Sequence, residues 1–390
     1  MKWKFYSLAF VAGMSILTAC SSDDNNDNDG NDGNGNGNEI ENGTILKGTI
    51  TSDVTLAAGN TYKLSGEYIV EEGATLHIEE GVKIIAVYDD IADYILVKQG
   101  GKINAVGTPD KPIVMTSEKE EPGAWGGIHI CGRAHTNAEG GKGSSEIGGA
   151  VYGGNDDADN SGTLQYIRLE YTGFAFDEEH EANGISFYGV GNGTIVDHCQ
   201  AYKGSDDGFE FFGGSVNVSN LVAVSCSDDS FDWTEGWNGK GTNLVAYQED
   251  KSTLGYDCDC LMECDNNGSN NAATPVAHPV LKNLILVGSG GSKQGIRLRA
   301  GTEVEIDNAK VCGKGQPLTV ETALTENALK NGTSKLTNIT LTSELSSKEG
   351  IYTHADFIAV TSNKVDANLS YSSFEDIRKE CSWMNGSWVK

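Results

Sequence analysis

A short internal repeat constrains the fold of this chain more than any other feature. Residues 205–211 read Ser-Asp-Asp-Gly-Phe-Glu-Phe, and residues 227–233, which lie 22 positions later, read Ser-Asp-Asp-Ser-Phe-Asp-Trp. Gly214 and Gly236 match at the same offset. A repeat of this length, with strand-forming residues between Gly and Asn turns, is typical of a solenoid whose coils stack on one another.

Less regular coils surround this pair. An Asn-Leu-Val/Ile-Ala/Leu segment recurs later in the chain, and short apolar runs bounded by Gly or Pro precede the repeat. None of this region has helical periodicity. The recurring segments are 220–223, 243–246 and 283–286, and the upstream runs are 74–81, 100–107, 112–117 and 125–128.

The succession of upstream runs resembles the N-terminal coils of bacterial surface proteins that contain a β-helix. With the repeat, the resemblance covers roughly residues 65–300. It implies an all-β fold, a right-handed parallel β-helix. In such a helix we expect Phe209, Phe211, Phe231 and Trp233 to face the core, because side chains alternate along a strand.

The ends of a parallel β-helix expose strand edges, so we expect a cap at each end. The C-terminal region offers a candidate. Residues 372–375 read Ser-Ser-Phe-Glu, which is typical of a capping box that opens a short helix towards Cys381.

The chain is strongly acidic, with a formal net charge of −28 over 390 residues. Without Lys2, Lys4 and the seven acids of residues 20–43, the remainder has 26 basic and 49 acidic residues, a net charge of −23. Such a surface repels nucleic acid and anionic lipid and attracts metal cations. We therefore expect no nucleic-acid partner.

The N-terminus predicts export and lipid anchoring. Lys2 and Lys4 precede an apolar stretch, residues 5–17, that is too short to span a bilayer. The following Leu-Thr-Ala-Cys resembles a bacterial lipobox, which implies a signal peptide at residues 1–19 and acylation, with palmitate among the chains, at Cys20. A transmembrane anchor and an ordinary cleaved signal are the alternatives.

Residues 20–43 are almost entirely Asp, Asn, Gly and Ser, so we expect a lipidated Cys followed by a disordered tether. The opening Ser-Ser-Asp-Asp after Cys20 resembles the export signal of surface lipoproteins of the Bacteroidetes. That resemblance implies an outer-membrane protein facing outward. The folded domain is then expected at residues 44–390, as a monomer.

Eight cysteines follow Cys20, an even number in an exported chain, so disulfides are expected. Their pairing does not follow from the sequence. Residues 257–265 mix three of these cysteines with acids, which leaves a thiolate metal site as the alternative.

Six acidic side chains of the repeat form a candidate metal site. Because strands one coil apart lie about 4.8 Å from each other, equivalent residues become neighbours. Like charges held this close raise one another's pKa or recruit a cation, and calcium suits a rigid patch of carboxylates. The alternative is that each Asp-Asp pair is only a turn. The candidate ligands are Asp206, Asp207, Glu210, Asp228, Asp229 and Asp232.

The same coils resemble family-nine polysaccharide lyases, β-helix enzymes in which an Ala-Asp-Gly-Phe coil precedes an Asp-Asp-Gly-Trp-Asp coil. The resemblance implies calcium ligands at Asp207, Asp228, Asp229 and Asp232. It also implies a catalytic lysine five residues after the first Asp, where this sequence has Phe212.

The sequence departs from those lyases at Ser230 as well, where they have Gly. The basic residues considered as a replacement base are Lys203, Arg297 and Arg299, and nothing in the sequence places them beside the acids. Arg297 and Arg299 lie two apart, so both should face solvent from one strand and could grip a carboxylate. The resemblance thus supports the metal site and argues against the elimination chemistry.

Three further groups are weaker candidates. Residues 177–181 (Asp-Glu-Glu-His-Glu) have metal-binding side chains but read better as a solvated acidic loop. Residues 155–160 (Asn-Asp-Asp-Ala-Asp-Asn) have alternating oxygen donors like a calcium loop and are a second calcium candidate, although they lack the Gly and distant Glu of an EF-hand. The aromatic residues of the third group could form a sugar-stacking platform, although Trp233 is expected in the core. That group is Trp233, Trp237, Tyr247 and Tyr256.

Together these features predict a membrane-anchored, surface-exposed lipoprotein that is not an enzyme. It would bind calcium and, through its long side, a glycan or a protein partner such as an outer-membrane protein. No catalytic residue is assigned. The alternative is a calcium-dependent lyase of uronate polysaccharides with a displaced base.

Overall fold

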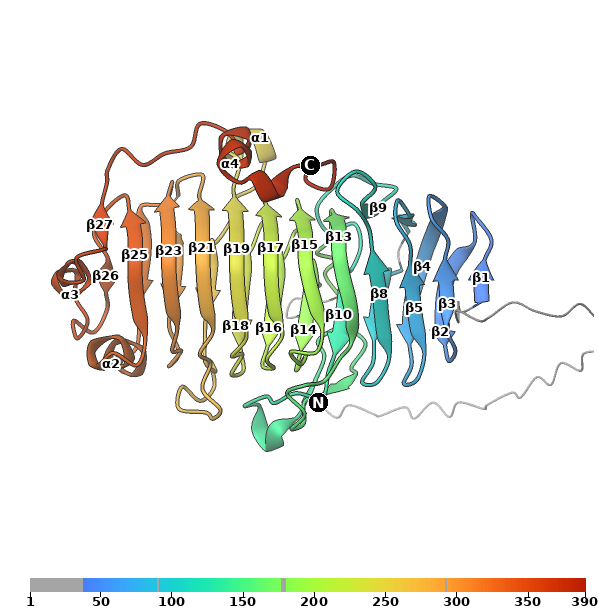
Figure 1. Cartoon of the computed structure of the whole chain (residues 1–390), viewed down its shortest axis with the longest axis horizontal. Coiled ribbons are helices and arrows are strands. Elements are labelled where there is room, and N and C mark those ends of the chain that lie inside the picture. Colours follow the sequence, from blue (N-terminus) through green and yellow to red (C-terminus); the bar gives the residue numbers. More distant parts are fainter. Residues whose placement is uncertain (1–37, 90, 177–179, 292) are drawn as a thin grey trace, which may run out of the picture. The chain divides into compact units, whose positions relative to one another are not determined.

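The computed structural model describes residues 38–89, 91–176, 180–291 and 293–390. They form a right-handed parallel β-helix in which 25 strands join one continuous sheet (Figure 1). The predicted fold class is thereby confirmed. The expected signal peptide, Cys20 and most of the expected tether lie outside the described residues. No helix in the described part of the chain is long and apolar enough to span a membrane.

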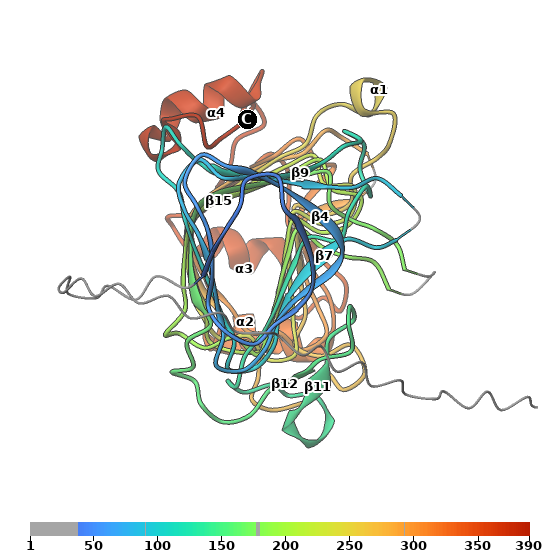
Figure 2. The same ribbon diagram turned by 90° about the vertical axis from the view of Figure 1, so that its right-hand side faces the viewer.

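Each coil has three faces around a common core (Figure 2). From residue 162 onward, one long strand per coil bends once and forms two faces, and a short strand forms the third. The long strands are β13 (Gly162–Glu170), β15 (Ile195–Tyr202), β17 (Asn217–Val224), β19 (Lys240–Tyr247), β21 (Val280–Val287), β23 (Glu305–Cys312) and β25 (Lys335–Leu341).

We call the face of short strands the ladder face. Its strands pair in parallel, each with the strand one coil away. They are β7 (Tyr94–Val97), β10 (Ile128–Cys131), β14 (Ile185–Tyr188), β16 (Phe209–Phe212), β18 (Phe231–Thr234), β20 (Met262–Cys264), β22 (Gln294–Leu298), β24 (Gln316–Val320) and β26 (Ser346–Ser347).

The first coils contain strands of less regular length. They begin with β1, which pairs with β3, so the ordered coils start before residue 44, where the sequence placed the start of the domain. These strands are β1 (Asn38–Ile40), β2 (Ile45–Ile50), β3 (Val54–Leu56), β4 (Thr61–Val70), β5 (Thr75–Ile78), β6 (Lys83–Ala86), β8 (Lys102–Val106) and β9 (Ile113–Ser117), and the last described strand is β27 (Lys364–Val365).

Asparagines stabilise the bends of the long strands. Asn220, Asn243, Asn283 and Asn308 occupy the bends of four consecutive coils, with φ between 55° and 64°. Asn tolerates this left-handed conformation better than most residues do. The side-chain amides of Asn243, Asn283 and Asn308 each donate to the Asn one coil earlier, at 2.8 Å, 3.0 Å and 2.9 Å, and that of Asn220 donates to Asp197 at 2.7 Å. The amides therefore hold the coils in register.

Aromatic residues of the repeat fill the core as predicted. Phe209, Phe211, Phe231 and Trp233 are all at most 2% exposed. The rings of Phe209 and Phe231 stack one coil apart, with centroids 5.6 Å from each other. Trp237 stacks on Phe211 at 4.1 Å and is 1% exposed. Both Trp residues of the suggested sugar-stacking platform are therefore core residues, and that interpretation is wrong for them.

Two helices lie at the C-terminal end of the coil stack, α2 (Ala323–Asn331) and α3 (His354–Ala359) (Figures 1 and 2). Leu329 and Phe357 from these helices join the main core. Glu326 of α2 is fully buried and accepts hydrogen bonds from the backbone N–H groups of 349, 351 and 352. These helices form the expected cap at this end.

The predicted C-terminal helix is present as α4 (Phe374–Glu380), but it does not cap the end. It lies along the side of the stack, near β17 and β19 (Figure 1). The Ser372–Glu375 capping box is not formed, because the N-cap position is Ser373, one residue later, and its side chain makes no cap hydrogen bond. Apolar side chains of the last residues pack on the outward side of the long strands, where they are buried with the apolar row of those strands.

Residues 132–160 form an insertion that we call the cover loop. It contains an antiparallel hairpin, β11 (Gly143–Ser144) and β12 (Val151–Tyr152). Its Ile147 and Tyr152 are buried in a cluster with Tyr188 and Phe212 of the ladder face. The cover loop thus shields the ladder face up to the C-terminal end of β16.

The eight cysteines of the described residues are all buried and all free, so the predicted disulfides are not formed there. The reason is visible in the strand register. Cys199 pairs with Ile167 and Leu221 of the adjacent coils, and Cys264 pairs with Trp233 and Leu298. These thiols behave as small core residues.

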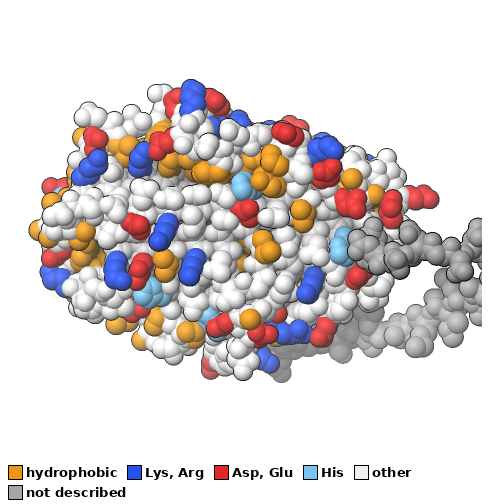
Figure 3. Space-filling model, in the orientation of Figure 1, with side chains coloured by type: hydrophobic (Ala, Val, Ile, Leu, Met, Phe, Trp, Pro, Cys, Tyr) orange, Lys and Arg blue, Asp and Glu red, His pale blue; other side chains and the backbone are white. Residues whose placement is uncertain are grey.

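Charged side chains are intermixed on the face of the molecule drawn in Figure 3. Ion pairs such as Lys335–Glu305, with 2.8 Å between Nζ and Oε1, are exposed and contribute little to stability.

Candidate metal centre

The ladder face carries a row of polar side chains in register. Glu210 of β16 pairs with Asp232 of β18, and Asp232 pairs with Glu263 of β20. Because their neighbours along each strand face the core, these acids point outward, as the 22-residue repeat predicted. Ser186 precedes Glu210 in the row and Arg297 follows Glu263. Three carboxylates of consecutive coils are thus stacked between a hydroxyl and a guanidinium.

A second rank of acids lies in the turns that lead into these strands. The backbone N–H of Asp229 donates to Oδ1 of Asp207 at 2.8 Å, and that of Cys260 donates to Oδ1 of Asp229 at 2.6 Å. Both Asp side chains are 5% exposed. The predicted stacking of Asp207 on Asp229 is confirmed. Each carboxylate uses one oxygen to tie two coils together, and its Oδ2 accepts no hydrogen bond from the described residues.

The two ranks bring ligand atoms of four trios within 4.8 Å of one another. All six acids predicted from the sequence belong to at least one trio. The trios are Asp206–Asp207–Asp228, Asp207–Glu210–Asp232, Asp229–Asp232–Glu263 and Asp229–Asp259–Cys260.

Burial and mutual repulsion make the charged form of these acids unfavourable. Burial, with the charge of Asp228, raises the pKa of Asp206 to about 7. Burial and neighbouring carboxylates raise the pKa of Asp207 and Glu210 well above the usual range. Oδ1 of Asp232 is buried and has no hydrogen-bond partner among the described residues. A hard divalent cation fits this donor set, because it would neutralise the carboxylates and use the unpartnered oxygen.

Several residues of this centre do not follow from the repeat. Glu263 is 31 positions after Asp232, because a loop with the short helix α1 (Lys251–Leu254) lengthens that coil. Asn183 donates to Oε2 of Glu210 at 2.6 Å. Glu146 of the cover loop lies close enough to contribute to the raised pKa of Glu210, after burial.

Basic residues lie at the C-terminal end of the row, which the sequence did not indicate. Arg297 contacts Glu263 at 2.8 Å, and Arg299 contacts Glu263 at 2.5 Å and Asp265 at 2.7 Å. Lys293, which no sequence pattern indicated, forms an ion pair with Asp259. These residues are bound by carboxylates rather than directed freely to solvent.

The position implied for a catalytic base is apolar and closed. Phe212 is 7% exposed, and its ring stacks on Tyr188 with centroids 4.4 Å apart. Lys203 is engaged elsewhere, in an ion pair with Glu249 at 2.8 Å.

The weaker candidates of the sequence differ in how they relate to this centre. In the loop 155–160, Asp157 contacts His135 at 2.6 Å, and Asp156 caps the turn by accepting from the N–H of Ala158. Residues 177–179 lie outside the described residues, but Glu181 of the same segment lies close enough for its charge to help raise the pKa of Asp206 and Asp228, after burial and nearer acids. Of the other two aromatic candidates, Tyr247 packs on Phe374, and Tyr256 donates its hydroxyl to the carbonyl oxygen of residue 225.

The segment 257–265 contributes to the centre through its acids and one thiol. Cys260 belongs to the trio with Asp229 and Asp259, whereas Cys264 faces the core. Burial raises the pKa of the Cys258 thiol to about 12, so this thiol is protonated at neutral pH. Three of the four trios consist only of carboxylates, which favours a hard cation over a soft one.

Comparison with known proteins agrees with this architecture. The profile of the family described as a pectate-lyase-like β-helix domain matches residues 48–389. No curated protein sequence matches the chain. Among solved structures, the Dettilon tailspike protein (gp208) aligns with a TM-score of 0.30 and 8% identity, covering 76% of this chain and 56% of its own. Because the matched residues include nearly all of the stacked coils, this chain belongs to the family of pectate-lyase-like β-helix domains.

Proposed function

We propose that this protein binds calcium on its ladder face and, through the cation, an acidic polysaccharide that it does not cleave. The observation that carries the proposal is the buried, unpartnered Oδ1 atom of Asp232, a residue that belongs to two carboxylate trios. A buried oxygen without a partner is costly, and here it lies among like charges. A bound cation would remove both costs.

Calcium suits the site better than other common cations do. It takes six to eight oxygen ligands at about 2.3 to 2.6 Å with flexible geometry, which stacked carboxylates can supply together with water and a ligand. Magnesium demands a near-ideal octahedron at shorter distances, which acids fixed on a sheet meet poorly. The resemblance of the repeat to family-nine lyases supports the same ion.

The polysaccharide is proposed from the charges beside the cation. A sugar carboxylate can complete the coordination of a calcium ion that protein side chains leave partly open. The half-buried Arg299 contacts Glu263 and Asp265 at the C-terminal end of the row and offers a guanidinium to the same kind of group. A protein partner with a row of acidic side chains is the other ligand that this surface would accept.

Melting of the full chain tests the proposal. Calcium at about 100 times its dissociation constant should stabilise the native state by about 2.7 kcal/mol. EDTA should lower the melting temperature, and calcium but not equal magnesium should restore it. Asp232→Asn should melt higher than wild type in EDTA, because repulsion is relieved, and should no longer respond to calcium.

The exposed Asp110, which lies outside all four trios, supplies the matched control. Asp110→Asn removes the same charge and should keep the full calcium response. A wild-type melting temperature that changes with neither EDTA nor calcium would contradict the metal site and favour the alternative that the acids are only turn residues.

A second candidate function, a calcium-dependent uronate lyase, is favoured by one observation: Lys293 lies beside the acids, paired with Asp259. Elimination needs a base that removes the proton next to the sugar carboxylate. Lys293 is 55% exposed and could reach a bound chain.

Absorbance of unsaturated uronate ends, measured on polygalacturonate and alginate with calcium, separates the two candidates. We expect no turnover from the wild type. Turnover that falls by a factor of about 10² to 10⁴ in Lys293→Met would establish the lyase instead. Lys111, which is also exposed and is paired with Glu80, provides the control: Lys111→Met should change nothing.

We also propose that the protein is anchored in the outer membrane through lipid on Cys20 and faces outward. The support is the order of charged residues, apolar stretch and Leu-Thr-Ala-Cys at the N-terminus, followed by an acidic Ser-Ser-Asp-Asp. A Gly-rich tether of this length has a mean reach of about 25 Å, enough to hold the coils away from lipid headgroups.

A further inference from the structure

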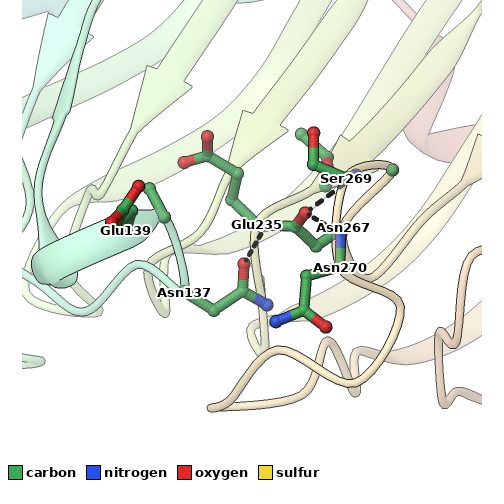
Figure 4. A pocket seen from close by; sticks show the side chains of 9 residues that line it. Asn137, Glu139, Glu235, Asn267, Ser269 and Asn270 are labelled. Carbon is green, nitrogen blue, oxygen red and sulfur yellow. Dashed lines mark hydrogen bonds between the residues drawn. The ribbon is translucent and has the colours of Figure 1, made fainter.

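A polar cavity lies close to the acids of the ladder face. It has a volume of about 580 Å³ and is formed where β18 ends, between the cover loop and the loop 267–270 (Figure 4). Ligand pockets commonly measure 300 to 1,000 Å³. Thr234 lines the cavity and lies two residues after Asp232 on the same side of the strand, a distance of about 7 Å. The cavity thus adjoins the proposed calcium site.

Hydrogen bonds hold the walls of this cavity in place. Asn137 of the cover loop is 8% exposed and donates through Nδ2 to Oδ1 of Asn266 at 2.8 Å and to the carbonyl of Pro275 at 3.0 Å. Its Oδ1 accepts from Nδ2 of Asn267 at 3.0 Å. Oδ1 of Asn267 in turn accepts from the backbone of residues 269 and 270. The two loops are therefore joined by hydrogen bonds that do not depend on a ligand.

Glu235 is the most informative residue of the cavity. It has φ of 53°, and the equivalent residue of the preceding coil, 22 positions earlier, is Gly213 with φ of 66°. Thr136 and Tyr152 both donate to its Oε2 at 2.7 Å. Its Oε1 accepts no hydrogen bond from the described residues. Glu235 thus has a backbone conformation that favours glycine. One oxygen of its carboxylate is held by two hydrogen bonds, and the other oxygen is left for a ligand.

The lining excludes most classes of ligand. It has two carboxylates, three amides and two hydroxyls, but no basic and no aromatic residue. Phosphate, sulfate and uronate groups would be repelled by Glu139 and Glu235, and apolar ligands would find little to contact. Sugar hydroxyls both donate and accept, and carboxylates and amides match both roles. Nδ2 of Asn270 and the hydroxyl of Ser269 are not used within the described residues.

We propose that this cavity binds a neutral, hydroxyl-rich sugar unit of the polysaccharide. The inference rests on the proposed function in one respect: the acidic unit of the same chain would lie at the calcium ion, and the neutral unit beside it. The preferred polysaccharide then contains both uronate and neutral sugars, either alternating along its backbone or with one kind as a side branch. Binding in the cavity itself does not require calcium.

Saturation-transfer NMR on the detergent-solubilised full chain tests this inference. The probe is a concentrated mixture of arabinose, galactose, glucose, mannose, rhamnose and xylose, with EDTA present. The wild type should transfer saturation to at least one of these sugars. Glu235→Gln, which keeps an acceptor for Thr136 and Tyr152, and Asn270→Ala should each weaken that signal at least about tenfold, because a charge-assisted or an amide hydrogen bond is lost.

The exposed Asn238, on the turn after β18 but outside the cavity, supplies the control: Asn238→Ala should bind as the wild type does. Asp232→Asn should also retain sugar binding while losing the calcium response, so failure of the two proposals can be told apart. No transfer to any of the six sugars, or equal transfer in Glu235→Gln and Asn270→Ala, would overturn the inference. So would a signal that appears only when calcium replaces EDTA.

Discussion

Asp93 is a buried carboxylate that lies apart from the acidic trios, and its pKa is raised by burial. It is 1% exposed, and its Oδ1 accepts from the N–H of Gly66 at 2.5 Å. Its Oδ2 is buried without a hydrogen-bond partner in the described residues. Burial raises the pKa of Asp93 to about 6, so the folded protein holds this proton more tightly than the unfolded chain does.

The raised pKa predicts how stability depends on pH. Between about pH 4 and pH 6 the folded state binds more protons at Asp93, so stability falls as the pH rises and stays lower above pH 6. Asp93→Asn, which mimics the neutral acid, should stabilise the protein at pH 8 by about 1 to 3 kcal/mol and leave it nearly unchanged at pH 3.5. Denaturant unfolding at both pH values, in EDTA, measures the difference. An equal effect at both would contradict this explanation.

At the scale of elements, the C-terminal segment explains an apolar row that the β-helix would otherwise expose. Val222, Val245 and Ile285 stack on one another on the outward side of the long strands. They are buried in one cluster with Ile377 of α4 and Trp388 near the chain end. The outer side of these strands is therefore a second, smaller core.

Removal of this segment should expose the row without disrupting the coils. A chain ending at residue 366 should lose about 2 kcal/mol for each large side chain no longer buried, and should aggregate. Val245→Thr with Ile285→Thr should restore solubility to the shortened chain but destabilise the full one, because it buries two hydroxyls. Light scattering and thermal melting measure both effects. A shortened chain as soluble and stable as the full one would contradict this role.

At the scale of the whole molecule, we expect the coils and the proposed anchor to be separable. The coils have their own core, and their C-terminal end is covered by α2 and α3. Folding and membrane attachment should then depend on different residues. An acyl chain contributes about 0.8 kcal/mol per buried methylene, so a multiply acylated Cys20 would hold the protein permanently.

Substitution of the anchoring residue tests this separation. Cys20→Ala should incorporate no labelled palmitate and should leave the protein unprocessed or soluble, with the melting temperature of its β-helix unchanged. Ser21→Ala, one residue later, should be labelled and retained as the wild type is. Palmitate on the Cys20→Ala chain would remove the basis for a lipid anchor at this residue.

The amino-acid sequence alone was sufficient to predict the stacked coils, the inward Phe209 and Trp233, and the pairing of Glu210 with Asp232. These features depend on strand alternation and on a coil length that repeats, and both are local properties. Where the coil length changes, the strand register can no longer be predicted from the repeat. Glu263 lies 31 positions after Asp232, so it was not predicted as the third acid of the row.

Only the tertiary structure decided what surrounds that row. Arg299 and Lys293 reach the acids from later coils. The cavity at Glu235 is assembled from three segments, and its Asn137 and Asn267 are 130 positions apart in the chain. The C-terminal helix has a clear local signal, yet its position depends on which apolar surface remains uncovered after the coils have stacked. Local periodicity determines each coil, whereas contacts between loops of unequal length are determined only by the packing of the finished stack.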